Sequence, residues 1–299
     1  MHASAAALLY NLLMNTSPQS GSVSILKSNG LRESFDPSKL IFSLKRVGAQ
    51  QGTIDRIVRE ITSRLHEGMT TTQIYSEAFA MLKEHHAPTA IKYSIRRAVL
   101  ELGPDGFPFE RFIARIFQSW GYDTLVDQTI LGSCVPHEID VVAWNKEKLI
   151  LVEAKYHNEF GMKSDLKVAL YIQARREDVA GTHFDYGNIN RVADEFWLIT
   201  NTKFSEQAIH YGECKGLHMI GWNHPAQGNM HDIIEKQGLH PITCLTSITR
   251  QEKNDLIAQK MLVCKDLIAH PEALHEAGIR DDRTAAIIEE AKMVIASAK

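Results

Sequence analysis

Residues 135–156 constrain the fold of this chain more than any other stretch. Two apolar segments are separated there by a short polar turn, and this pattern predicts an antiparallel β-hairpin. Successive side chains of a strand point to opposite faces, so Glu153 and Lys155 share one face of the second segment. Asp140 is the acidic residue between apolar neighbours in the first segment. The hairpin therefore predicts a compact polar site backed by core residues.

Such a site suits metal-assisted hydrolysis of a phosphodiester. Two carboxylates match Mg²⁺, a hard ion that takes few protein ligands and keeps several waters. A bound metal lowers the pKa of a water, and a nearby lysine would orient that water or stabilise developing negative charge. The alternative is an ordinary amphipathic hairpin, in which Asp140, Glu153 and Lys155 simply face solvent.

The flanking sequence favours the catalytic interpretation. Residues 108–121 carry apolar side chains at helical spacing, and Glu110 lies off that stripe near the expected start of the helix. Residues 196–200 and 217–221 predict two further buried strands, joined by a helix at about 205–214. The order resembles the PD-(D/E)xK nuclease superfamily, and most closely the Mrr-type restriction endonuclease domain, over residues 107–236.

That resemblance rests on an ordered set of matches: Glu110, Gly121-Tyr122, Ile139-Asp140, Val152-Glu153-Ala154-Lys155 and Leu198-Ile199-Thr200 followed by Phe204-Ser205. It implies that Asp140 and Glu153 bind Mg²⁺ or Mn²⁺, that Lys155 is the catalytic lysine, and that Glu110 is a further acid near the metal. It also implies DNA as a partner. The chain departs from the family where a glycine-rich approach is replaced by residues 136–138, and there His137 and Glu138 either add to the site or close the loop.

Residues 162–178 predict a helix that carries cationic side chains: Lys163, Lys167, Arg175 and Arg176. In a nuclease these side chains would touch the phosphate backbone, because cationic groups add affinity that is independent of sequence. A solvated helix face explains them equally well.

A second unit precedes the nuclease-like part. Residues 23–35 predict a small hairpin about an Asn-Gly turn, and Asp36-Pro37 predicts the capped start of a helix. Further helices are expected at 39–47, 53–65, 71–85 and 89–102. This arrangement resembles the ATP-cone, a regulatory nucleotide-binding domain, from residue 23 to about residue 100.

The ATP-cone resemblance implies ATP or dATP as a regulatory ligand. Lys27 and Lys39 would contact the triphosphate, and Glu33 and Thr71 would hold the base or ribose. Arg97, which ends the family's last motif, is a further residue expected to bind the nucleotide. In the family the first lysine is commonly followed by arginine, whereas this chain has serine at position 28, so one phosphate contact is missing.

The sequence therefore predicts an α/β protein with a restriction endonuclease-like core, a central mixed sheet flanked by helices. We expect a tail at 1–21, a mainly helical ATP-cone with a small β-hairpin at 22–103, the nuclease domain at 104–242 and a helical C-terminal region at 250–299. The boundary between the first two domains is the breaker cluster at 103–108. The last region reads as a packing or dimerisation tail.

Composition adds little about the substrate. The net charge of −3 gives no overall basic signal, and the four cysteines show no paired spacing. We expect a cytoplasmic homo-oligomer without a membrane segment. The leading prediction is a nucleotide-regulated, metal-dependent DNA endonuclease of restriction or phage-defence type. The alternatives are a non-catalytic, nucleotide-sensing DNA-binding regulator, or a nuclease of the same superfamily that acts on junctions or RNA.

Overall fold

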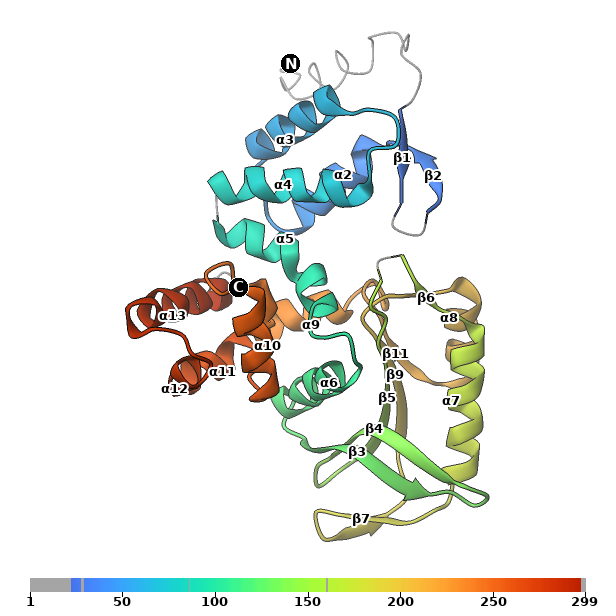
Figure 1. Ribbon diagram of the computed structural model, residues 1–299. Helices are drawn as coiled ribbons and strands as arrows, with labels where there is room; N and C mark the ends of the chain where they lie inside the picture. Colours follow the sequence, from blue (N-terminus) through green and yellow to red (C-terminus); the bar gives the residue numbers. More distant parts are fainter. Residues whose placement is uncertain (1–22, 28–29, 86, 160, 297–299) are drawn as a thin grey trace, which may run out of the picture.

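The computed structural model describes residues 23–27, 30–85, 87–159 and 161–296. The predicted tail at 1–21 and part of the predicted Asn-Gly turn lie outside these residues. Figure 1 shows a smaller N-terminal unit above a larger body that contains the main sheet. Among the described residues, no helix is both long and apolar enough to cross a bilayer.

The N-terminal unit combines a two-stranded hairpin with a bundle of helices. Its elements are β1 (Ser24–Leu26), β2 (Arg32–Ser34), α2 (Pro37–Arg46), α3 (Gln51–Arg64), α4 (Thr71–His85) and α5 (Ala87–Leu100). The strands pair antiparallel, as predicted. Asp36 caps α2 because its carboxylate accepts a hydrogen bond from the Ser38 amide at 2.9 Å. The predicted hairpin and capped helix are therefore confirmed.

The body is built on a mixed five-stranded sheet with the order β11-β9-β5-β4-β3. The strands are β3 (Asp123–Leu131), β4 (Pro136–Trp144), β5 (Leu149–Lys155), β9 (Glu195–Thr200) and β11 (His218–Ile220). β3, β4 and β5 run antiparallel, whereas β9 and β11 continue the sheet parallel to β5. The predicted β4–β5 hairpin is confirmed, with Val141 opposite Val152.

Helices cover both faces of this sheet (Figure 1). α6 (Phe107–Ser119) packs on one face, and α7 (Leu166–Val179) and α8 (Glu206–Lys215) pack on the other. Alternate residues of β4 divide accordingly, since Val141 and Ala143 belong to the core under α6 while Val142 belongs to the core under α7. The expected α/β architecture, a mixed sheet between helical layers, is thus observed.

Two short pairings flank the sheet. β6 (Lys163–Ser164) and β10 (Lys203–Phe204) pair in parallel, and β7 (Phe184–Tyr186) and β8 (Ile189–Arg191) form a hairpin. The helix predicted from residue 162 begins only at Leu166, because Asp165 caps it by accepting from the Lys167 amide at 3.0 Å. The start predicted for this helix was therefore wrong.

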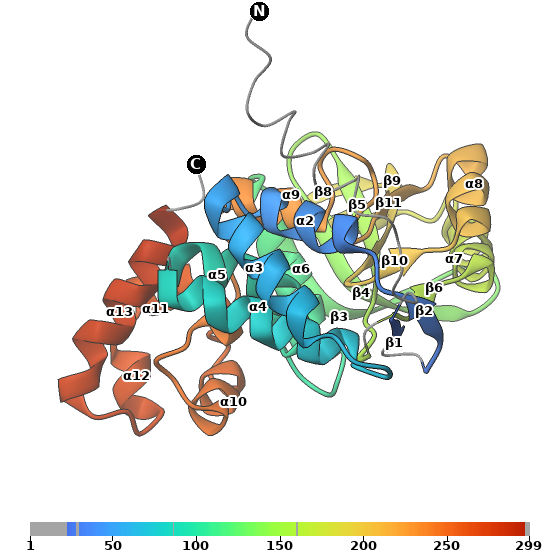
Figure 2. The same ribbon diagram turned by 90° about the horizontal axis from the view of Figure 1, so that it is seen from above.

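The C-terminal helices belong to the same hydrophobic core as α6. They comprise α9 (Met230–Gln237), the 3₁₀ turn η1 (Ile242–Cys244), α10 (Arg250–Ala258), α11 (Cys264–Ala269), α12 (Glu272–Glu276) and α13 (Asp281–Ala296). Figure 2 shows α13 and α11 beside α5. The helical C-terminal region expected at 250–299 consists of several helices, and the first of them, α10, ends before Lys260, whose φ of 66° is incompatible with a continuing helix.

Helix α5 contributes to two hydrophobic cores, that of the N-terminal unit and that under α6. Ala90 belongs to the core of the N-terminal unit, whereas Ile91, Ile95 and Val99 belong to the core that runs through α6, the sheet and α13. The Tyr156 hydroxyl donates to the carbonyl oxygens of both Leu100 and Gly103, at 2.5 and 2.6 Å, and so ties the end of α5 to the sheet. The described chain therefore has no free linker at this junction.

Candidate active site

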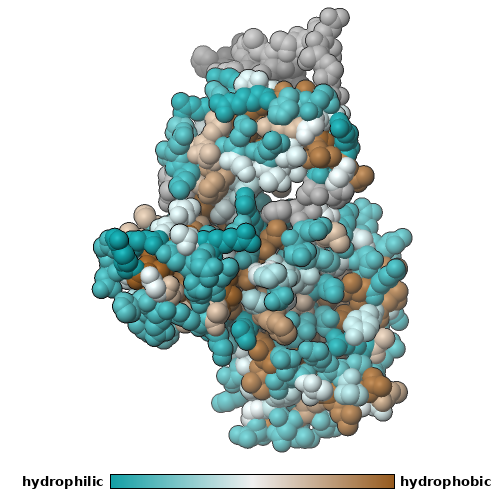
Figure 3. All heavy atoms as spheres, in the orientation of Figure 1, coloured by the Kyte–Doolittle hydropathy of each residue, from teal (hydrophilic) through white to brown (hydrophobic). Residues whose placement is uncertain are grey.

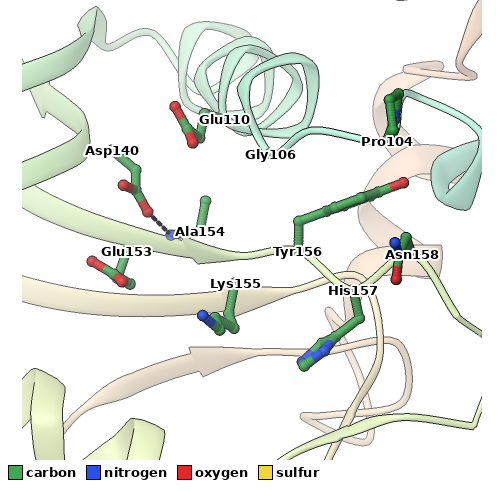
Figure 4. A pocket seen from close by; sticks show the side chains of 10 residues that line it. All are labelled: Pro104, Gly106, Glu110, Asp140, Glu153, Ala154, Lys155, Tyr156, His157 and Asn158. Carbon is green, nitrogen blue, oxygen red and sulfur yellow. Dashed lines mark hydrogen bonds between the residues drawn. The ribbon is translucent and has the colours of Figure 1, made fainter.

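The four residues expected to form a catalytic set line one cleft of about 410 Å³ at the carboxyl end of β5. Glu110 comes from the first turn of α6, Asp140 from β4, and Glu153 and Lys155 from β5. Figure 4 shows the three carboxyl groups on one side of Lys155, and on the other side the loop residues that complete the lining: Tyr156, His157 and Asn158.

Asp140 is fixed by the strand that it faces. Its Oδ2 accepts a hydrogen bond from the Ala154 amide at 2.6 Å (Figure 4). Burial raises the pKa of Asp140 above its ordinary value, although the bond from Ala154 and the charge of Arg175 oppose the rise. The carboxyl group is thus held in a site that disfavours an uncompensated negative charge.

Glu153 has an ion-pair partner that the sequence did not reveal. The guanidinium of Arg175 in α7 contacts its Oε2, and the same guanidinium donates to the Glu138 carbonyl oxygen. Burial and then the charge of Asp140 raise the pKa of Glu153 to about 7, and Arg175 limits that rise. Arg175 was expected on an exposed helix face that meets either phosphate or solvent, but its side chain is only 11% exposed. Arg175 therefore compensates the negative charge of Glu153 within the protein interior.

Glu110 faces the other acids from across the cleft. Burial raises its pKa to about 7, and the charges of Asp140, Asp127, Glu138 and Glu153 add to the rise. A carboxyl group with a pKa near 7 exchanges its proton easily at neutral pH. Glu110 therefore has the properties of a group that holds or accepts a proton.

Lys155 is the cation of the cleft and is exposed. Its position is set by pairing with Thr200 of β9. The loop that follows is held rigidly, because Asn201 accepts from the His157 amide at 2.9 Å and donates to the His157 carbonyl at 2.7 Å. Burial, followed by the charge of Lys155, lowers the pKa of His157. His157 is therefore a neutral wall of the cleft at neutral pH.

The structure resolves the two interpretations of the segment before Asp140. His137 Nε2 lies 2.7 Å from Asp178 Oδ2, and Asp178 also accepts from the Cys134 amide at 2.8 Å. Hydrogen bonds from His137 and Cys134 lower the pKa of Asp178 to about 2. His137 closes the β3–β4 loop and does not line the cleft. Glu138 acts on the site through its charge and its carbonyl oxygen.

The cleft fits a divalent cation on electrostatic grounds. The charges of Asp140 and Glu153 help to raise the pKa of Glu110, and the charge of Asp140 helps to raise that of Glu153, so a bound cation would relieve this repulsion. Among the residues described, no three His, Cys, Asp or Glu side chains converge as a ready-made metal cage. Two carboxylates with water in the remaining positions are, however, sufficient for Mg²⁺.

In the N-terminal unit, three of the residues expected at the nucleotide site lie together. Glu33 Oε2 lies 2.9 Å from Lys27 Nζ and 3.2 Å from Lys39 Nζ, and the hydrogen bond from Lys27 contributes most to lowering its pKa. Thr71 begins α4, next to the point where β1 meets Thr70. Arg97 instead pairs with Glu101 at 2.7 Å near the end of α5. The structure thus groups the hairpin residues and places Arg97 on a different element.

Comparison with known proteins defines the family. The family described as AF1548-like, C-terminal, matches residues 240–295. An uncharacterized protein of Archaeoglobus fulgidus is 34% identical over 184 residues, which cover 61% of this chain and 99% of that protein. A crystal structure titled protein of unknown function AF1548 is similar with a TM-score of 0.53 and 32% identity, over 64% of this chain and 99% of that one. The chain is an α/β protein built on a mixed sheet. It belongs to the AF1548-like family.

Proposed function

We propose that this protein is a metal-dependent DNA endonuclease whose activity is regulated by ATP or dATP. The observation that carries the proposal is the presence of Glu110, Asp140, Glu153 and Lys155 in one cleft, contributed by one helix and two adjacent strands. The raised pKa values of Glu110 and Glu153 add to it, because strongly perturbed carboxyl groups gathered in a cleft mark functional sites.

In the proposed reaction Asp140 and Glu153 would hold Mg²⁺ or Mn²⁺. When bound, the metal ion supplies Lewis acidity and makes a nearby water more acidic. The Lys155 ammonium group orients the attacking water and stabilises the negative charge that develops on the scissile phosphate. Glu110, with its pKa near 7, accepts a proton at its carboxylate. Arg175 keeps Glu153 in position while the ion is absent.

Regulation is assigned to the N-terminal unit. Lys27 and Lys39 present two ammonium groups on one side of the β1–β2 hairpin, where a triphosphate would replace the Glu33 carboxylate as their partner. A nucleotide bound there regulates cleavage only if it binds two states of the protein with different affinity. The shared helix α5 connects its site to the body.

A plasmid-nicking assay tests the proposal. Wild-type protein is incubated with supercoiled DNA and Mg²⁺ or Mn²⁺, with and without ATP or dATP, beside Asp140→Asn and Lys155→Met. Asp185→Asn and Lys146→Met are matched controls, since both residues are exposed and lie outside the cleft. We expect cleavage by the wild type and the controls, and a loss of at least 100-fold in the two cleft variants.

Equal cleavage by Asp140→Asn and wild type would overturn the catalytic assignment. Cleavage that is indifferent to both nucleotides would overturn the regulatory one. Parallel reactions with a four-way junction and with RNA determine whether duplex DNA is the preferred substrate. Binding of DNA without cleavage under any metal condition would favour the non-catalytic, nucleotide-sensing regulator instead.

A further inference from the structure

Positive charges gather on the surface where the N-terminal unit meets the body, and we call the surface around Lys163 and Lys203 the cationic surface. Lys163 of β6 and Lys203 of β10 are direct partners in a parallel pair of strands, and both side chains are exposed. Within the described part of the chain, neither ammonium group forms a salt bridge with a carboxylate. Two adjacent lysines without a counter-ion are unfavourable on a free surface, so they indicate a site for an anion.

This lysine pair is connected to the wall of the candidate active site. The Ser164 hydroxyl lies 3.0 Å from His157 Nε2 and 3.2 Å from the Thr200 hydroxyl. Thr200 is the strand partner of Lys155, and Lys203 follows it by three residues, which span at most about 10 Å. The pair therefore lies at the same end of the sheet as the catalytic cleft.

Cations of the N-terminal unit face the same region. Arg46 of α2 donates to Asn223 and Asn229 of the body, at 3.1 and 3.0 Å. Arg96 of α5 lies 5.9 Å from the centre of the Trp222 ring, and the Trp222 amide donates to the Thr202 carbonyl at 2.7 Å, next to Lys203. Figures 1 and 2 both place the β1–β2 hairpin above the β6 end of the body.

The pKa of Lys203 is lowered by burial and by the cations around it. Partial burial of its ammonium group lowers the pKa of Lys203, and the positive charges of Arg96, Lys163, Lys27 and Arg46 lower it further. Figure 3 shows the narrowing between the N-terminal unit and the body. Lys27 and Arg46 are paired with Glu33 and Asp232, so among the residues described Lys163 and Lys203 are the lysines of this surface that have no carboxylate partner.

We propose that this cationic surface holds the sugar-phosphate backbone of the DNA strand that continues out of the catalytic pocket, with Lys163 and Lys203 as its principal phosphate contacts. The proposal deepens the proposed nuclease function and rests on it. An extended strand fits better than a small polyphosphate, because the cations near Lys203 come from both the N-terminal unit and the body. Phosphate contacts of this kind position a nucleic acid without reading its sequence.

The test is DNA binding without cleavage. Fluorescence anisotropy with a labelled oligonucleotide is measured in EDTA for the full chain, at several KCl concentrations. Lys163→Gln/Lys203→Gln is compared with Lys146→Gln/Lys215→Gln, which removes two exposed lysines from the opposite end of the parallel strands. Thermal melting checks that all variants are folded.

We expect Lys163→Gln/Lys203→Gln to bind DNA at least 10-fold more weakly than the wild type. The slope of log K against log salt should fall in magnitude by about 1.4 for single strands or about 1.8 for duplex. The control should match the wild type. Equal DNA affinity and equal salt dependence in Lys163→Gln/Lys203→Gln and in the control would overturn the inference. The inference would also be overturned if Lys163→Gln/Lys203→Gln lost the binding of inorganic tripolyphosphate, measured by calorimetry, but kept the binding of DNA.

Failure of the inference is distinguishable from failure of the proposed function. A protein that cleaves plasmid but binds DNA independently of Lys163 and Lys203 retains the nuclease assignment and loses the cationic path. A protein that binds DNA through these lysines and never cleaves it retains the path and loses the nuclease assignment.

Discussion

Arg175 of α7 forms an ion pair with Glu153 of β5, and the two side chains are only 11% and 18% exposed. The pair joins a helix on one face of the sheet to the strand that carries the candidate catalytic acid. Removing one member of a buried pair leaves the other charge without compensation. This ion pair therefore links the stability of the protein to the charge state of its cleft.

We expect Arg175→Met to lower the free energy of unfolding by about 3 kcal/mol, because Glu153 is left buried and unpaired. Urea denaturation measures the change. Lys167→Met is the control, since it removes a cation from an exposed position of the same helix and should change stability by less than about 0.5 kcal/mol. Equal effects of the two substitutions would show that the ion pair contributes nothing.

Metal binding is expected to raise the melting temperature of the wild type. At a metal concentration 100 times the dissociation constant, the stabilisation is about 2.7 kcal/mol. Asp140→Asn keeps an acceptor for the Ala154 amide but loses the charge, so we expect its metal-dependent shift to disappear. Asp185→Asn should keep the shift. The metal site is refuted if Asp140→Asn responds to Mg²⁺ and Mn²⁺ like the wild type.

Lys39→Gln should weaken ATP binding about 10-fold, which corresponds to about 1.4 kcal/mol, because one charge-assisted contact to the triphosphate is lost. Isothermal titration calorimetry provides the measurement. Lys45→Gln removes an exposed lysine from the last turn of the same helix and should bind ATP normally. An unchanged affinity in Lys39→Gln would remove the β1–β2 hairpin from the nucleotide site.

Glu290 of α13 holds the loop that precedes α10. Its carboxylate accepts from the backbone amides of Thr246 and Ser247, at 2.8 and 3.0 Å, and from both of their hydroxyl groups. Burial raises the pKa of Glu290, but these hydrogen bonds outweigh burial, so the net pKa lies below its ordinary value of 4.5. A lowered folded-state pKa stabilises the fold above about pH 4.5, and this contribution is lost as the pH falls through the folded pKa.

Glu290→Gln should therefore destabilise the protein by about 2 kcal/mol at pH 7. The difference from the wild type should shrink progressively below about pH 4.5, which denaturation at several pH values measures. Glu289→Gln, an exposed position on the same helix, is the control. A difference that is independent of pH would show that the charge of Glu290 has no role.

Ile287→Ala tests whether the C-terminal helices belong to the core. Ile287 of α13 is 0% exposed, and its truncation should cost about 3 kcal/mol in urea denaturation. Met293 of the same helix is 52% exposed, so Met293→Ala should cost less than about 0.5 kcal/mol. Similar small effects at both positions would mean that α13 is dispensable.

Local patterns in the sequence were sufficient to predict most of the helices and strands. The β4–β5 hairpin and the helices of the N-terminal unit follow from strong apolar periodicity and from Asp36 as a cap. β3 gave no such signal, because only Ile130 along it is buried and Asp127 interrupts it with a φ of 55°. Exposed and partly buried residues alternate along β3, but the partly buried face carries Thr124 and Gln128 beside Val126, so the sequence shows no apolar alternation.

The candidate site was predictable to the same extent. Asp140, Glu153 and Lys155 lie on neighbouring strands, so their convergence follows from the hairpin and the alternation of strand faces. The inward position of Arg175 did not follow, because it depends on how α7 rotates against the sheet, which is a property of packing. The cationic surface could not be predicted either, because Lys163 and Lys203 lie 40 residues apart in the sequence and only the pairing of β6 with β10 brings them together.

The sharing of α5 between two cores has a mechanical consequence. A glycine-rich linker would allow the two halves of the molecule to tumble separately, but a helix with Ala90 packed on one side of the junction and Ile95 on the other transmits torque. Tilting α2, α3 and α4 relative to the sheet has to bend that rod or unpack it. The stiffness of one helix therefore sets how much work a ligand must do to change the angle between the halves.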